Sequence, residues 1–263
     1  MRPVEFFQTH PVFRHEEFVA ACYPAAPRTS RAAERALAHH QSTGRLSRIR
    51  RGLFAVNAPG FAISSFQIAS RLAPDAIIAY HSALEYLGAA YSLWSERFVL
   101  AGTKTKGFRH EGVLYRPVSF PVALDTPGRQ AFGVETREDG GIAVRVTGLE
   151  RTLVDLLDRP EYSGGWEELW RSFENAGFLD TRVIVQHTRH LANRTTAARV
   201  GWFLEQHREQ WLVPESVLAE LETMVPASPV YLLRSRRESG KLHPRWNLIV
   251  PQRVSGHDWA EVS

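Results

Sequence analysis

One stretch of the chain decides the fold of its N-terminal part: TSRAAERALAHHQSTGRLSRIRRGLFAV, residues 29–56. Thr29 or Ser30 can cap a helix here, and no helix breaker follows before Gly44. The residues after that glycine predict two short strands joined by a turn at Arg51-Gly52. A helix followed by a basic hairpin is the layout of a winged helix-turn-helix domain, and we predict that domain at the N-terminal end.

The predicted helix has two different faces. Small and apolar side chains share one face: Ala33, Ala36, Leu37 and His40. Arg31 and Arg35 lie on the opposite face at 100° per residue. Early side chains of a recognition helix must reach base edges in a groove about 12 Å wide, so this pattern favours contact with DNA.

The positive charge of the chain is concentrated near its start. Residues 1–75 hold ten arginines and five acidic residues, a net +5, whereas residues 76–263 carry −1. Such clustering predicts a polyanionic partner, which we take to be duplex DNA with an inverted repeat. The residues expected to contact DNA are Arg28, Thr29, Ser30, Arg31, Arg35, Arg45, Arg48, Arg50 and Arg51. The alternative is an ordinary solvated face, because 29 of the 32 basic residues are arginine.

The 263 residues are enough for two domains, which we place at 1–75 and 76–263. A helix over 60–73 and Pro74 would close the first domain. The second should contain a mostly antiparallel sheet at about 96–147, helices at about 148–224 and a final strand at about 245–250. The expected fold class is therefore α+β.

Composition excludes several classes of protein. Apolar residues make up 44% and charged residues 23%, as in folded globular chains. No apolar run reaches the roughly 18 residues of a membrane helix, so we expect neither a membrane partner nor secretion. Cys22, the single cysteine, permits no internal disulfide, and we expect a cytoplasmic protein.

The motifs of common enzymes are absent, and we expect no catalytic residue, metal or cofactor. The lysines Lys104, Lys106 and Lys241 lack the acidic residue two positions earlier that a metal-dependent nuclease would show. His187 and His190 share a helix face without the third ligand that zinc requires. Tyr80-His81-Ser82 invites a catalytic interpretation, but the sequence does not locate an acid partner for His81, and we expect Ser82 to cap the helix.

Longer segments resemble a known family. They are VTGLERTLVDLLDRPEYSGGWEEL (146–169), NRTTAARVGWFLE (193–205), RWNLIVP (245–251), AYHSALEYLG (79–88) and RIRRGLFAV (48–56). Together they resemble the AbiEi family, the antitoxins of type IV toxin-antitoxin systems in abortive phage infection. The resemblance implies a winged-helix domain that represses its own operon and a C-terminal antitoxin domain. It also implies a nucleotidyltransferase toxin as functional partner, without a stable complex.

The antitoxin function would use the C-terminal domain. The candidate surface residues are Glu150, Arg151, Asp155, Arg194 and Arg199. The plainer interpretation is an ordinary helix with an Arg151–Asp155 pair at i, i+4. Two other functions stay open: a stand-alone ligand-sensing winged-helix regulator, and a nuclease fused to a winged helix.

Overall fold

The computed structural model describes residues 1–25, 30–58, 60, 62–174, 176–233 and 240–256. The chain forms two compact units. The first comprises Met1–Ile78, Ser95–Ser119 and Glu135–Val146, and the second Ala79–Trp94, Phe120–Val134 and Thr147–Ser263. The fold class is mixed α+β, as expected. The division at residue 75 stays a prediction about independent folding, since the compact units cut the chain elsewhere.

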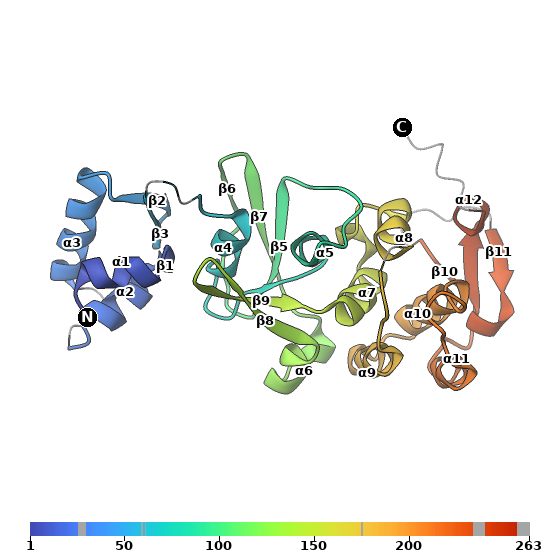
Figure 1. The fold of residues 1–263 in the computed structure, drawn as a ribbon. Helices are drawn as coiled ribbons and strands as arrows, with labels where there is room; N and C mark the ends of the chain where they lie inside the picture. Colours follow the sequence, from blue (N-terminus) through green and yellow to red (C-terminus); the bar gives the residue numbers. More distant parts are fainter. Residues whose placement is uncertain (26–29, 59, 61, 175, 234–239, 257–263) are drawn as a thin grey trace. The chain divides into compact units, whose positions relative to one another are not determined.

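The N-terminal elements follow the order helix, strand, helix, helix, strand, strand (Figure 1). They are α1 (Pro3–Thr9), β1 (Val12–Arg14), α2 (His15–Cys22), α3 (Arg31–Ser42), β2 (Leu46–Arg50) and β3 (Leu53–Val56). The strands form an antiparallel sheet in the order β1-β3-β2. We call these elements the N-terminal module. Its α1 and β1 were not expected, because elements this short show no reliable periodicity.

Phenylalanine side chains fill the core of the N-terminal module. The buried members are Phe6, Phe7, Phe13, Phe18 and Phe54. Ala33 and Leu37 of α3 pack into the same cluster. Burying a side chain as large as leucine contributes about 1.5–3 kcal/mol, so this core fixes which face of α3 points outward.

Local chemistry sets the limits of α3 and of the hairpin. The Ser30 hydroxyl accepts a hydrogen bond from the Ala33 amide at 3.3 Å, which is the predicted cap. Gly44, with φ +71°, follows the end of the helix. Gly52, with φ +80°, forms the tight turn between β2 and β3 that the sequence predicted.

A six-stranded sheet has the order β6-β7-β5-β4-β9-β8. Its strands are β4 (Ile77–Ile78), β5 (Glu96–Leu100), β6 (Phe108–His110), β7 (Val113–Val118), β8 (Val134–Asp139) and β9 (Ile142–Thr147). The sheet is mixed: β4 pairs with β5 and β6 with β7 in antiparallel, whereas β5 pairs with β7 and β4 with β9 in parallel, so the expectation of a mostly antiparallel sheet is met only in part. Residue alternation predicts strands but carries no information on their direction.

The helix expected over 60–73 is only α4 (Ser65–Ser70). It packs on β4 and β5, and the Gln67 side chain donates to the Asp139 carbonyl at 2.9 Å. The range expected to hold the sheet, about 96–147, also contains a helix: α6 (Pro127–Ala131) comes before β8 begins.

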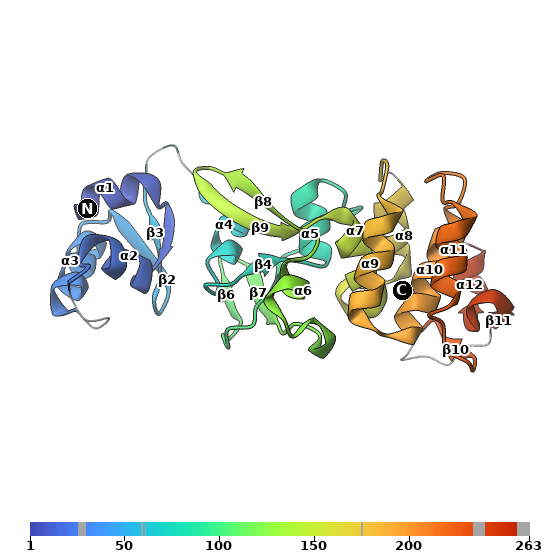
Figure 2. The same ribbon diagram turned by 90° about the horizontal axis from the view of Figure 1, so that it is seen from below.

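The second unit is largely helical. Its α-helices are α5 (His81–Leu87), α6, α7 (Leu149–Asp158), α8 (Trp166–Glu174), α9 (Thr181–Leu191), α10 (Arg194–Gln206), α11 (Glu215–Glu222) and α12 (Gln252–Ser255). Short 3-10 turns are η1 (Val122–Leu124), η2 (Pro160–Tyr162) and η3 (Pro244–Trp246). Figure 2 shows α9, α10 and α11 running side by side. None of the described helices combines the length and apolar character needed to cross a membrane.

A small sheet packs against α10. It comprises β10 (Val230–Tyr231), β11 (Gly240–His243) and β12 (Leu248–Pro251) in the order β10-β12-β11. The predicted final strand therefore begins later, after the turn that carries Trp246. The buried Trp246 ring packs directly against Gly201 on α10, where any Cβ would overlap the ring.

Candidate nucleic-acid interface

Two arginines project from the outer face of α3. Arg31 and Arg35 are exposed, whereas Ala33 and Leu37 on the opposite face are buried. The helical periodicity therefore predicted both faces correctly. Ser30 is buried, and its hydroxyl caps α3 by accepting a hydrogen bond from the Ala33 amide. It is therefore not exposed for the DNA contact expected from the sequence.

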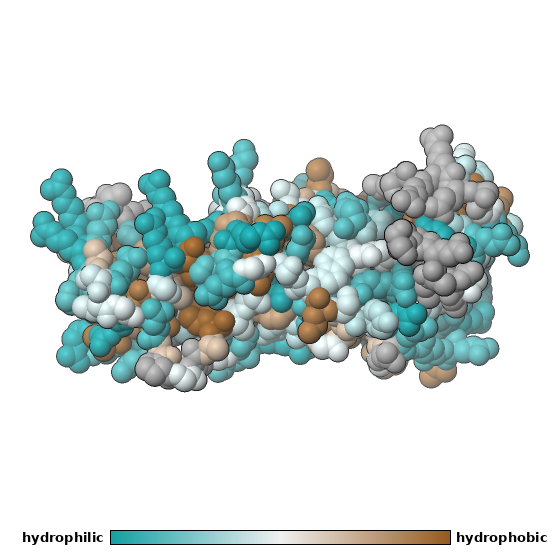
Figure 3. Space-filling model, turned by 90° about the horizontal axis from the view of Figure 1, so that it is seen from above, coloured by the Kyte–Doolittle hydropathy of each residue, from teal (hydrophilic) through white to brown (hydrophobic). Residues whose placement is uncertain are grey.

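The β2–β3 hairpin adds two exposed guanidinium groups. Arg48 alternates with the buried Ile49 along β2, and Arg51 stands at the turn. Their exposure agrees with the role predicted for a basic hairpin, which is contact with phosphates. In the space-filling view of Figure 3, long hydrophilic side chains stand out over the N-terminal elements.

Arg50 is placed differently from its neighbours in the hairpin. Its guanidinium donates hydrogen bonds to the carbonyls of Leu72 and Lys106, each at 2.8 Å, and to the Thr105 hydroxyl at 3.0 Å. It also lies 4.8 Å from the centre of the Phe108 ring, and burial lowers its pKa below the ordinary value. The assignment of Arg50 to phosphate contact is corrected, because its donors are used within the protein.

Arg45 is exposed and follows α3. Its side chain lines a cavity of about 600 Å³ whose other walls come from α1, β3 and the β8–β9 turn. Arg28 and Thr29 lie outside the residues that the structure describes.

The exposed arginines are available to an anion. They are Arg31, Arg35, Arg45, Arg48 and Arg51. Within the described part of the chain, no carboxylate forms an ion pair with any of the five. Because an unpaired guanidinium keeps its charge and its donors for a ligand, the N-terminal module presents a surface suited to phosphate groups.

The candidate antitoxin surface was largely wrong, because Arg151, Asp155 and Arg199 are buried. Arg151 donates to Asp155 at 3.2 Å, and His187 Nε2 lies 2.7 Å from the other carboxylate oxygen. Burial raises the pKa of Asp155, but the neighbouring His187 and Arg151 outweigh it, and the pKa lies below its usual value. This group is a buried ionic network, which fixes α7 against α9.

The remaining two residues of that candidate set lie nearer the surface. Glu150 is half-buried and accepts a hydrogen bond from the Asp180 amide at 3.1 Å. Arg194 is exposed and lines a cavity of about 310 Å³ beside Arg189. The structure therefore does not bring the five predicted residues together on one surface.

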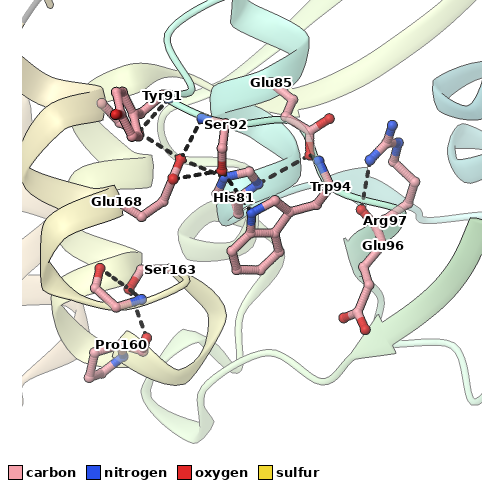
Figure 4. A network of polar contacts seen from close by, with 12 residues as sticks. His81, Glu85, Tyr91, Ser92, Trp94, Glu96, Arg97, Pro160, Ser163 and Glu168 are labelled. Atoms are coloured by element: carbon pink, nitrogen blue, oxygen red, sulfur yellow. Dashed lines mark hydrogen bonds and ion pairs between the residues drawn. The ribbon is translucent and has the colours of Figure 1, made fainter. Parts of the chain in front are cut away.

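A second buried polar network surrounds His81 (Figure 4). The imidazole lies 3.1 Å from Glu85 and 2.9 Å from Glu168, and the Trp94 ring stacks on it at 4.0 Å. The Ser92 hydroxyl donates to Glu168 at 2.7 Å. Burial raises the pKa of Glu168, but hydrogen bonds from Ser92 and His81 outweigh that effect and lower it.

The acid partners of His81 were not predicted from the sequence. Glu168 lies 87 residues away in the chain, so no local motif could have identified it. Glu85, at i+4 on α5, was the available signal. The expectation for Ser82 was also wrong, because Tyr80 holds the cap position and Ser82 is buried inside α5. His81 contacts no nucleophile in these hydrogen bonds, and the network ties α5 and the segment after it to α8.

Titratable side chains do not gather into a metal centre within the described ranges: no group of three or more His, Cys, Asp or Glu lies together. His187 bonds to Asp155, and His190 packs edge-on against Phe132. Both rings are therefore held by protein contacts.

Comparison with known proteins gives a fold relationship. No family model matches the chain, and no curated protein matches it either. The crystal structure of the RV2827C protein from Mycobacterium tuberculosis is similar, with a TM-score of 0.56 and 16% sequence identity. The match covers 94% of this chain and 89% of that chain. At this identity the likeness concerns the fold alone.

Proposed function

We propose that the chain is a DNA-binding transcriptional regulator that contacts duplex DNA through α3 and the β2–β3 hairpin. The observation that carries the proposal is a set of five exposed arginines, on α3, on the hairpin and at Arg45 between them, that form no ion pair with any carboxylate the structure describes. The element order of the N-terminal module supports it, because winged-helix domains have the same order. In this proposal α3 is the recognition helix and the hairpin is the wing.

The two elements would do different work on the duplex. Arg31 and Arg35 lie in the first turns of α3, and the first turns of a recognition helix face the base edges. In the major groove, arginine pairs with guanine. Arg48 and Arg51 would meet phosphates, which position a protein without reading sequence. Two copies on an inverted repeat would give the site its symmetry.

Selection of DNA tests this proposal without a known operator. Fragments of the source genome are incubated with the full chain at about 100 mM salt, and bound fragments are sequenced. We expect enrichment of a fragment that contains an inverted repeat, above all a fragment from upstream of the gene that encodes this chain. Recovery of fragments in proportion to their input would contradict sequence-specific regulation.

The resemblance to the AbiEi family extends the proposal to an antitoxin of a type IV system. We expect autorepression through the N-terminal module and protection through the C-terminal part of the chain, residues 76–263, against a nucleotidyltransferase toxin. The test is co-expression of a toxin encoded beside this gene with the chain carrying Arg31→Ala, Arg35→Ala and Arg51→Ala, from an unrelated promoter. Survival is expected. Cell death at normal protein level would show that protection requires DNA binding.

The cavity beside α1 favours a second candidate function, a regulator that senses a small ligand. It measures about 600 Å³, within the range of ligand pockets, and Val4, Phe7, Pro11 and Val56 line it. A thermal-shift screen with metabolites separates the two candidates. A ligand that raises the melting temperature and changes operator affinity would favour the sensor, whereas protection against a toxin favours the antitoxin.

A further inference from the structure

A second group of cations lies outside the residues that the sequence assigned to DNA contact. Lys104, Lys106 and Arg109 belong to the loop before β6 and to β6 itself, and all three are exposed. The chain contains only three lysines, and two of them are here. We call residues 102–110 the basic shelf. No ion pair involves these three side chains in the part of the chain that the structure describes.

The backbone of the basic shelf is held in place at both ends of its loop. The Asp75 carboxylate accepts hydrogen bonds from the amides of Gly102 and Thr103, at 2.7 and 2.9 Å. Arg50 then binds the Lys106 carbonyl and the Thr105 hydroxyl. A charge on a loop fixed in this way loses less conformational entropy on binding than a charge on a free tail.

Arg50 also makes the basic shelf continuous with the hairpin. It is the last residue of β2, and Arg51 follows it at the turn. A cavity of about 350 Å³ opens between that turn, at Gly52, and Lys104 on the shelf, with Arg14 and Glu16 in its wall. Arg14 is paired with Glu16 and Glu17, so among the described residues that line this cavity Lys104 is the Lys or Arg without an ion pair.

We propose that the basic shelf is a second phosphate-contacting surface, which extends the duplex DNA footprint beyond the hairpin. This inference rests on the proposed function. Lysines fit the task because an ammonium group neutralises a backbone phosphate without selecting a base. Continuity with Arg51 identifies the occupant as the same duplex, running on from the hairpin.

The test compares Lys104→Ala/Lys106→Ala with Lys241→Ala in the full chain. Lys241 is the exposed third lysine, on β11, and serves as the matched control. Affinity for a 40-base-pair random duplex is measured by fluorescence anisotropy from about 50 to 200 mM salt. Loss of two phosphate contacts should make the slope of log K against log salt shallower by about 1.8. The control should keep the wild-type slope.

A shorter duplex tests where the contacts lie. On about 16 base pairs centred on a selected site, the double variant and the wild type should converge, because the flanking phosphates are missing. A double variant with wild-type slope on the long duplex would overturn the shelf, while Arg31→Ala/Arg35→Ala losing sequence preference would leave the proposed function intact. Wild-type protein that binds no duplex at low salt would overturn both.

Discussion

Arg50 and Phe108 form a cation–π contact at 4.8 Å, which joins the end of β2 to the basic shelf. The same guanidinium makes three hydrogen bonds within the protein. Arg50 and Arg51 are neighbours in sequence with different surroundings, and they should respond differently to the same substitution.

Arg50→Ala should lower the free energy of unfolding by about 1–2 kcal/mol, because charged hydrogen bonds to Leu72 and Lys106 are lost from a half-buried site. Arg51→Ala should leave stability unchanged and make the salt slope of DNA binding shallower by about 0.9. Urea denaturation and anisotropy check the two effects. Equal stability of both variants would show that the Arg50 contacts contribute nothing.

Arg31→Ala or Arg35→Ala should weaken binding to a selected operator by about 1–3 kcal/mol and reduce discrimination against mutated operators. The reason is that an arginine pairs bidentately with guanine. Competition between operator and random duplex measures the effect. Arg48→Ala is the comparison, since loss of a phosphate contact should weaken both duplexes alike. Identical behaviour of α3 and hairpin variants would contradict the assignment of α3 as recognition helix.

Asp155→Asn should destabilise the second unit by about 3–5 kcal/mol at neutral pH, because it leaves Arg151 buried without its counter-charge. The pKa of Asp155 is lowered in the fold, so its contribution is present above the unfolded value of about 3.9 and is lost as pH falls through the lower folded value. The stability difference between wild type and variant should therefore shrink below about pH 4. A difference that stays constant with pH would contradict this account.

His81→Ala should cost about 3 kcal/mol, because the carboxylates of Glu85 and Glu168 lose a partner in a buried site. Hydrogen exchange should accelerate in the segment that carries Ser92. Ser92→Ala removes one hydroxyl from the same network and should cost only about 1 kcal/mol. Unchanged exchange in the His81 variant would mean that the network does not hold this segment.

Local features were predictable from the sequence. The helix cap at Ser30, the two faces of α3 and the turn at Gly52 all depend on residues within one element or its neighbour. A helix at the start of the range 148–224 was likewise predictable, because the leucines of α7 keep a helical period and the helix ends before Pro160.

Long-range pairs were not predictable in the same way. Arg50 looked like its exposed neighbours, since its partner Lys106 lies 56 residues away. Arg151 and Asp155 looked like a surface pair at i, i+4, but every residue from Arg151 to Asp158 is buried because neighbouring helices surround α7. A charged residue reveals its burial only through partners, and those come from other elements.

The most direct test of the account is the affinity of the full chain for its own upstream DNA as salt rises from about 50 to 200 mM, with a random duplex of equal length beside it. The four cations assigned to phosphates, Arg48, Arg51, Lys104 and Lys106, predict a slope of log K against log salt of about −3.6 per copy, and the slope would reach about −6 if Arg31, Arg35 and Arg45 also neutralised phosphates. They also predict that the upstream DNA binds more tightly at every salt concentration. A slope near zero, or equal affinity for both duplexes, would contradict the claim that this chain is a sequence-specific DNA-binding regulator.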